Sequence, residues 1–271
     1  MFKEAIERIE RKIPAPDATY KGDDGLLHCA VCHRNVQTVI QIFGETRTVP
    51  CICDCKVAEM KRHEEAQKQQ ELDRRRRVCF AETNMASWTF ENDDRQNAKL
   101  SDAMQRYVEK FPEFRQQGKG LLLSGTFGTG KTYLAACIAN ALIDKGYTAK
   151  MTNFATLTNK LQGMFEGKQE YINSLNDFSI VIIDDLGAER KTEYMQETVF
   201  NIIDSIYRAG TPLIITTNLT LDEIKKPPSR EFARIYDRIL ERCFPIEVNG
   251  VSRRRQAVKE TYFDMKETLG L

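Results

Sequence analysis

The chain contains one complete phosphate-binding loop, which constrains its fold more than any other feature of the sequence. Residues 125–132 read Gly-Thr-Phe-Gly-Thr-Gly-Lys-Thr and match the pattern G-x-x-x-x-G-K-[ST]. The apolar run Leu121 to Leu123 precedes the loop, and a helix-like stretch, Tyr133 to Ile143, follows it. The motif requires this strand–loop–helix setting, so a glycine-rich turn without a ligand is the weaker interpretation. The sequence therefore predicts an α/β fold that binds a nucleoside triphosphate.

Each part of the loop has a physical role in holding phosphate. The glycines let the backbone turn tightly and bring its N–H groups onto phosphate oxygens, and the N-terminal end of the following helix adds a positive field. Lys131 is expected to reach the β- and γ-phosphates, and the Thr132 hydroxyl to ligate Mg²⁺. The nucleotide-binding residues predicted here are Gly125, Thr126, Phe127, Gly128, Thr129, Gly130, Lys131, Thr132 and Tyr133.

Length and composition describe a globular protein. The 271 residues leave room for one large domain, or for one domain and a small module. A net charge of +1 gives no overall attraction to nucleic acid, so any such surface must be local. No apolar run approaches the roughly 18 residues that span a membrane, and residues 1–11 lack the apolar core of a signal peptide. We therefore expect a cytoplasmic protein without membrane contact, whose cysteines stay reduced.

Five of the eight cysteines lie close together near the N-terminus. They form the patterns Cys29-x-x-Cys32 and Cys51-x-Cys53-x-Cys55. In a reducing compartment such spacings favour a structural zinc site, and a reactive or disulfide-forming cluster is the alternative. Cys29 and Cys32 are expected ligands, and two of Cys51, Cys53 and Cys55 would complete the four. A module this small cannot be held together by burial alone, so the metal would contribute much of its folding free energy.

A polar segment follows the cysteines. Residues 57–77 are rich in helix formers, contain neither glycine nor proline, and have too few apolar positions for a buried face. We predict a zinc-binding module at 1–60, a charged helical linker at 61–79 and an ATPase domain at 80–271. The run Arg74 to Arg77 is either part of a solvated linker or a contact for nucleic acid or an acidic partner.

Two later apolar runs end in polar residues. The run Ile180 to Ile183 leads into Asp184 and Asp185, as in a buried parallel strand with functional groups at its carboxyl end. Asp184 is expected to hold Mg²⁺ through water, and Asp185 to act as the general base on the attacking water. The run 212–217 ends at Asn218, which would position that water or, alternatively, only form a turn.

Arginines recur late in the chain. In the predicted helix Glu231 to Cys243, Arg234, Arg238 and Arg242 are spaced four residues apart. An arginine suits a γ-phosphate held by a neighbouring subunit, and an exposed stripe of salt bridges is the alternative. One arginine of the segment 252–255, Ser-Arg-Arg-Arg, could return to the nucleotide of its own chain.

The order of these motifs resembles the AAA+ ATPases of the DnaC/DnaI helicase-loader group. The resemblance covers Trp88 to about Arg255 and is closest at residues 182–189 and 234–239. It implies an AAA+ P-loop NTPase core, in which helices flank a parallel sheet and ATP is hydrolysed to ADP and phosphate.

The resemblance also implies roles for single residues. Lys131 and Thr132 match the Walker A pair, and Asp184 and Asp185 match the Walker B pair. Asn218 matches sensor 1, Arg238 the arginine finger, and Arg254 the sensor 2 arginine. The implied catalytic residues are therefore Lys131, Asp185, Asn218 and Arg238.

The resemblance implies partners as well. The cysteine cluster is similar to the zinc-binding N-terminal domain of the DnaI branch, which carries the helicase contact in that family. A loader of this kind would bind a replicative DnaB-type hexameric helicase, grip single-stranded DNA during replication initiation and self-associate through its ATPase domains. In this family the insertion before Walker B tends to face DNA. Its stacking and basic candidates here are Lys160, Phe165, Lys168 and Tyr171, although packing on the sheet is the alternative for the aromatics.

Two other functions stay open at this stage. An IstB-type transposition ATPase shares the core and assembles on duplex DNA, but it has a different N-terminal extension, so the cysteine module argues against it. A zinc-containing adaptor would bind ATP as a structural switch with negligible turnover. Asp185 and Arg238 argue against the adaptor.

Overall fold

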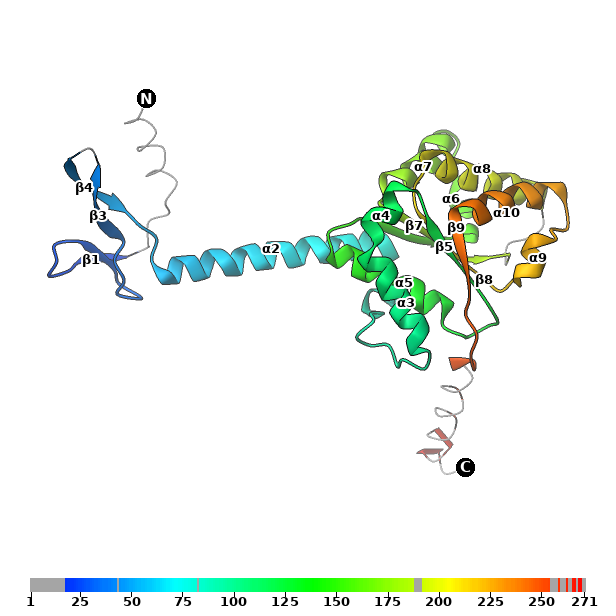
Figure 1. Ribbon diagram of the computed structural model, residues 1–271, viewed down its shortest axis with the longest axis horizontal. Coiled ribbons are helices and arrows are strands. Elements are labelled where there is room, and N and C mark those ends of the chain that lie inside the picture. The colour runs from blue at the N-terminus through cyan, green and yellow to red at the C-terminus, as the bar shows by residue number, and fades with distance from the viewer. Residues whose placement is uncertain are drawn as a thin grey trace. The chain divides into compact units, whose positions relative to one another are not determined.

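The computed structural model describes residues 18–42, 44–81, 83–187 and 192–253, together with positions 258, 262, 265, 266, 268 and 269 (Figure 1). The chain divides into two compact units, one ending at Glu71 and the other beginning at Leu72. This division falls within the segment 61–79, which the sequence analysis assigned to a linker.

The first unit contains two small antiparallel sheets. Its strands are Thr19–Lys21 (β1), Leu27–Cys29 (β2), Gln37–Ile42 (β3) and Glu45–Pro50 (β4). β1 pairs with β2 and β3 pairs with β4. Among the described residues of this unit, the buried cluster consists of Cys29, Val36 and Cys53. So small an apolar cluster contributes little to folding, as expected for a module that depends on a metal.

A long helix, α2 (Asp54–Phe80), begins in the first unit and ends in the second. The helix expected from residues 57–77 is therefore present. Its buried residues, Cys79 and Phe80, lie in the last turn. Just before them, Arg75 donates to the Gly146 carbonyl, and Arg76 contacts Asn140 and Asp144. These two arginines therefore make contacts within the second unit. The run 74–77 was expected to be either part of a solvated linker or a contact for nucleic acid or an acidic partner, and these contacts match neither expectation.

Five parallel strands form the sheet of the second unit, in the order β6-β7-β8-β5-β9. In chain order they are Gly120–Ser124 (β5), Ala149–Asn153 (β6), Ile180–Leu186 (β7), Leu213–Thr217 (β8) and Cys243–Glu247 (β9). The three central strands, β7, β8 and β5, are almost wholly buried because both faces of the sheet are covered there, and neighbouring residues such as Ile182 and Ile183 enter different cores. β5 and β8 approach closely at Gly120, where a Cβ atom would lie 1.7 Å from the Leu213 carbonyl oxygen.

Helices cover both faces of this sheet. Ala98–Glu109 (α3) and Lys131–Asp144 (α5) pack on one face, and Phe154–Gln162 (α6), Glu193–Ala209 (α8) and Arg230–Arg242 (α10) pack on the other (Figure 1). The shorter helices are Phe111–Gln116 (α4), Lys168–Ser174 (α7) and Leu221–Lys225 (α9), with 3₁₀ turns at Asn84–Ser87 and Leu175–Asp177. None of the described helices is long and apolar enough to cross a membrane. The predicted α/β fold is confirmed.

Candidate nucleotide site and cysteine cluster

The phosphate loop joins β5 to α5, and the segment after β9 lies against it. A Cβ atom on Gly125 would lie 2.4 Å from the Val248 carbonyl oxygen, and one on Gly128 would lie 2.2 Å from Ser252 Oγ. Both glycines also have positive φ angles, 147° and 81°, which side chains disfavour. The Arg253 amide donates to the Gly128 carbonyl at 3.0 Å. Glycine is therefore required here by the tight approach of a second segment as well as by the turn.

Lys131 brings the loop and the end of β8 together. Its side chain is buried, and Nζ lies 2.8 Å from the carbonyl oxygens of Gly125 and Thr126. Nζ also donates to Asn218 Oδ1 at 2.8 Å. The two residues predicted for Walker A and sensor 1 thus meet directly, although 87 positions separate them.

Asp184 lies between two threonine hydroxyls. Thr132 Oγ1 donates to its carboxylate at 2.9 and 3.2 Å, and Thr216 Oγ1 donates to Oδ1 at 2.5 Å. Burial raises the pKa of the Asp184 carboxyl above its ordinary value, while the Thr216 hydrogen bond acts in the opposite direction. The Thr132 hydroxyl and the Asp184 carboxylate offer the hard oxygen ligands that Mg²⁺ prefers.

A cavity of about 470 Å³ opens at this edge of the sheet. Its lining residues are Trp88, Phe127, Gly128, Gly130, Lys131, Thr132, Tyr133, Asp185, Asn218 and Arg253. A larger and mainly apolar cavity of about 650 Å³ lies between α3, α4 and β9. That larger cavity contains none of the predicted catalytic groups, so we assign the nucleotide to the smaller one.

Arg253 lines this cavity and is one of the arginines that could return to the nucleotide of their own chain. Its guanidinium lies 2.9 Å from Asp94 Oδ1 and 3.6 Å from the buried carboxylate of Asp93. The sensor 2 role was predicted for the next residue, Arg254, which lies outside the described residues. Among the described residues, Arg253 is the arginine that lines the cavity.

Arg238 lies on α10 and does not line the cavity of its own chain. Its guanidinium pairs with Asp204 on α8 at 2.6 Å and stacks 4.6 Å from the centre of the Phe200 ring. Arg234 stacks on the same ring at 4.5 Å. The arginine-finger role needs a neighbouring subunit and stays a prediction.

The insertion between β6 and β7 forms α6 and α7. Lys160 Nζ lies 4.2 Å above the Tyr171 ring, and Tyr171 packs against the core. Phe165, between the two helices, is fully exposed at 103%. The packing alternative therefore describes Tyr171, whereas Phe165 is open to a partner.

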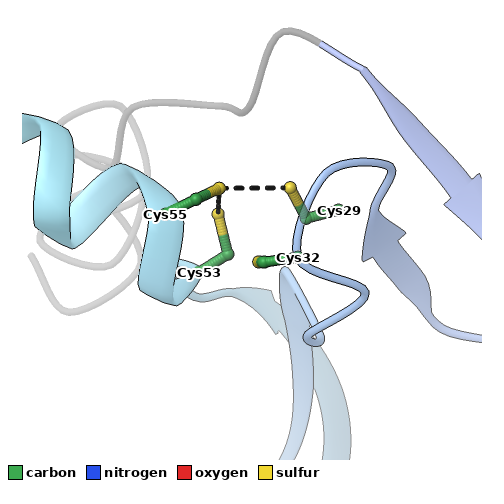
Figure 2. Close-up of side chains that lie close together, drawn as sticks. All are labelled: Cys29, Cys32, Cys53 and Cys55. Carbon is green, nitrogen blue, oxygen red and sulfur yellow. Dashed lines mark hydrogen bonds between the residues drawn. The ribbon is translucent and has the colours of Figure 1, made fainter.

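Four of the five clustered cysteines converge on one point (Figure 2). The sulfurs of Cys29, Cys32, Cys53 and Cys55 all lie within 4.8 Å of one another. Cys55 Sγ is 3.4 Å from Cys29 Sγ and 3.2 Å from Cys53 Sγ. Four sulfurs around zinc lie about 3.8 Å apart, since each Zn–S bond is about 2.3 Å, so this set fits a tetrahedral zinc ion.

Cys51 lies outside this group of described residues. Its thiol donates to the Asn35 carbonyl oxygen at 3.3 Å, and burial raises its pKa. By contrast, hydrogen bonds from the backbone amides of Cys55 and Arg34 lower the pKa of Cys32 to about 6. Hydrogen bonds to the neighbouring cluster thiols raise the pKa of Cys55 as well, so the position of the sulfur, and not its pKa, separates Cys51 from the other four cysteines. Spacing alone could not separate Cys51 from Cys53 and Cys55.

Comparison with known families identifies the nucleotide-binding core. The family model described as "IstB-like ATP binding protein" matches residues 50–261, more than half of the chain. The chain belongs to this family. Its AAA+ P-loop NTPase class and its ATP-binding character follow from this membership and from the fold.

Curated proteins that are similar to this chain include helicase loaders and an insertion-sequence protein. The "Replicative helicase loader DnaI" of Bacillus subtilis is 25% identical over 205 residues, covering 70% of this chain and 65% of the relative. The "Replicative helicase loader DnaC" of Escherichia coli K12 is 27% identical over 175 residues, covering 62% of this chain and 69% of the relative. A "Putative insertion sequence ATP-binding protein" of Sinorhizobium fredii is 31% identical over 149 residues, covering 53% of this chain and 49% of that protein.

A solved structure shares the fold of this IstB-like chain. The crystal structure of DnaI superposes with a TM-score of 0.54 at 25% identity, covering 66% of this chain and 99% of that one. The resemblance to the DnaC/DnaI group is thereby confirmed. Trp88 lines the cavity but was not among the predicted site residues, whereas Arg253 was one of the arginines left open in the segment 252–255. Trp88 belongs to no motif, although its ring lies 5.7 Å from that of Tyr133.

Proposed function

We propose that this chain is an ATP-dependent loader that brings a replicative DnaB-type helicase onto single-stranded DNA when replication begins. One observation carries the proposal: relatives that share the nucleotide-binding core are named replicative helicase loaders. The geometry supports it, since Lys131, Asp184 and Asn218 are gathered at one edge of the sheet on the fold of DnaI. Its compartment would be the cytoplasm, where the cysteines remain thiols.

ATP hydrolysis to ADP and phosphate would drive the release of the helicase. Lys131 would hold the β- and γ-phosphates, and Asn218, which touches Lys131 Nζ, would position the attacking water. Asp185 lines the cavity and would accept the proton of that water. Thr132 and Asp184 would hold Mg²⁺, whose charge neutralises the developing charge on the phosphates.

Self-association would complete this site. Arg238 is oriented by Asp204 and Phe200 on its own chain, so it would reach the γ-phosphate of a neighbouring copy with little side-chain ordering. The exposed Phe165 would stack on a base of single-stranded DNA, next to the lysine at position 168.

The cysteine cluster would bind one zinc ion through Cys29, Cys32, Cys53 and Cys55 and support the helicase contact. Exposed apolar side chains on the same module, Val31 at 76% and Val39 at 49%, provide a surface for a protein partner. Isolated hydrophobic residues on a surface are common, so this observation supports the proposal only in combination with the metal cluster.

A transposition helper is the second candidate. Its supporting observation is the similarity to the insertion-sequence protein, which however spans about half of each chain. A helper of that class would bind duplex DNA rather than a helicase. The adaptor alternative would bind ATP and turn it over negligibly.

Helicase capture by the full-length chain tests the loader proposal. In the presence of ATP and zinc, the intact protein should retain the replicative helicase of its own organism and about one zinc ion. Cys53→Ser should lose both the zinc and the helicase, because it removes one of four ligands. Cys51→Ser is the matched control and should lose neither.

The outcomes separate the candidates. If the intact, zinc-loaded protein captures no helicase but binds duplex DNA, the transposition reading replaces the loader. Equal, negligible ATP turnover by the parent and by Asp185→Asn, together with tight ATP binding, would favour the adaptor.

A further inference from the structure

One threonine on β8 touches both Walker B carboxylate residues. Thr216 is fully buried. Its hydroxyl donates to Asp184 Oδ1 at 2.5 Å and accepts the backbone N–H of Asp185 at 3.0 Å. A hydroxyl can donate one hydrogen bond and accept others, so this geometry uses it in both directions.

The pairing of β7 with β8 explains why Thr216 contacts both Asp184 and Asp185. Ile183 of β7 pairs with Ile215 of β8, and Leu186 pairs with Thr217. Two residues of β7, Asp184 and Asp185, therefore lie opposite the single residue Thr216, which is a β-bulge. Because of the bulge, the Asp185 amide does not take part in the regular hydrogen bonding between the strands. It donates to the Thr216 hydroxyl instead.

The bulge also places Asp185 in an unusual backbone conformation. Its φ angle is 58°, in the left-handed region that residues other than glycine seldom adopt, although aspartate tolerates it better than most. A hydrogen bond from the Asp185 amide fixes this conformation and so fixes the direction in which its carboxylate leaves the strand.

We propose that Thr216 is a positioning residue that orients the magnesium ligand Asp184 and the general base Asp185 together. This inference rests on the proposed function for the roles of the two aspartates. Thr216 does not line the nucleotide cavity and acts through the two carboxylate residues. Loss of the Thr216 hydroxyl should leave both carboxylates less firmly oriented. ATP turnover should then fall, and more Mg²⁺ should be needed to support nucleotide binding.

The neighbouring threonine provides a matched control. Thr217 is equally buried, and its hydroxyl also makes two hydrogen bonds, to the Leu186 carbonyl at 2.7 Å and from the Leu219 amide at 3.1 Å. Both of these partners are backbone groups, and neither is a carboxylate. Thr216→Val and Thr217→Val thus remove the same group from adjacent positions of one strand, and Thr216→Ser restores the hydroxyl at the first.

The experiment measures ATP turnover and the Mg²⁺ dependence of nucleotide binding in the full-length variants. Thr216→Val should lower kcat by on the order of tenfold to a hundredfold, as expected when a hydrogen bond to a charged group is lost. It should also raise the Mg²⁺ concentration that gives half-maximal nucleotide binding, while nucleotide binding without Mg²⁺ stays near the parent value. Thr216→Ser should recover most of both effects, and Thr217→Val should show neither.

Three results would overturn the inference. They are an unchanged Mg²⁺ dependence in Thr216→Val, an equal effect in Thr217→Val, or no recovery in Thr216→Ser despite a parent-like melting temperature. If the parent itself does not hydrolyse ATP, the proposed function fails. The Mg²⁺ dependence of binding still decides the role of Thr216, because that measurement requires no turnover.

Discussion

The Arg76 side chain connects the last turns of α2 to the rest of the ATPase unit through polar contacts. Its removal should lower the free energy of unfolding of that unit. The side chain is 17% exposed. Its Nε donates to Asn140 Oδ1 at 3.1 Å, and its Nη2 pairs with Asp144. Asn140 is itself buried and donates to the carbonyl oxygens of Met85 and Trp88, both at 2.9 Å. Arg76 therefore supports the segment that carries Trp88 into the nucleotide cavity.

The size of the effect follows from these contacts. A hydrogen bond to a charged group contributes about 1.5–3 kcal/mol, and leaving the Asn140 oxygen without a donor adds to the loss. The Asp144 partner is 48% exposed, so solvent screening reduces its share. We expect Arg76→Ala to lower the free energy of unfolding by about 2–3 kcal/mol. For a domain of this size that is a fall in melting temperature of roughly 4–12 °C.

Fluorescence of the single tryptophan, Trp88, provides the assay, because Asn140 connects it to Arg76. The control is Arg77→Ala, which removes the next, exposed residue of the same helix and should leave the melting temperature within about 1 °C. Equal melting temperatures for the two variants would refute the reasoning. The arginine run would then belong to a linker or to a nucleic-acid contact.

Three further predictions concern the site. Phe165→Ala should weaken binding to single-stranded DNA by about 1–3 kcal/mol in a titration, and the exposed Phe244→Ala should not. Arg238→Ala should abolish the stimulation of ATPase activity by self-association but leave ATP affinity unchanged. Asp204→Asn, which removes the charged partner of Arg238, should retain part of that stimulation. An equal loss of stimulation in both variants would mean that Arg238 acts through its pairing with Asp204 and not as an arginine finger. Asp184→Asn should raise the melting temperature at pH 7 relative to the parent. Burial raises the pKa of this carboxyl, so the folded state keeps the proton to higher pH than the unfolded chain, and stability falls as the pH rises above about 4. A variant whose melting temperature lies below that of the parent at pH 7, with the gap unchanged at low pH, would contradict the last prediction.

Much of the ATPase fold was predictable because its signals are local. The phosphate loop needs particular residues at fixed spacings, and the central strands β5, β7 and β8 are short apolar runs that are buried on both faces. Lys131 and Asn218 were predicted to act on the same nucleotide, and their contact in the structure reflects the single edge at which parallel strands end.

Other features depend on contacts between distant positions, and the sequence does not reveal them. Arg76 finds its partners 64 and 68 residues away. The bulge that places Asp184 and Asp185 opposite Thr216 arises from the register of two strands, and no residue pattern marks it. The choice among three cysteines turned on the position of the Asn35 carbonyl oxygen, which accepts from Cys51.

The close approach of β5 and β8 at Gly120 has a consequence for how this protein can vary. The missing side chain lets the two central strands come together, since even a methyl group would collide with the Leu213 carbonyl oxygen. One strand carries the phosphate loop, and the other carries Thr216 and leads to Asn218. A larger residue at position 120 would wedge the strands apart at the edge far from the cavity and tilt these two groups relative to each other. A substitution at position 120 should therefore first impair ATP binding and turnover, although this position is far from the residues that line the nucleotide cavity.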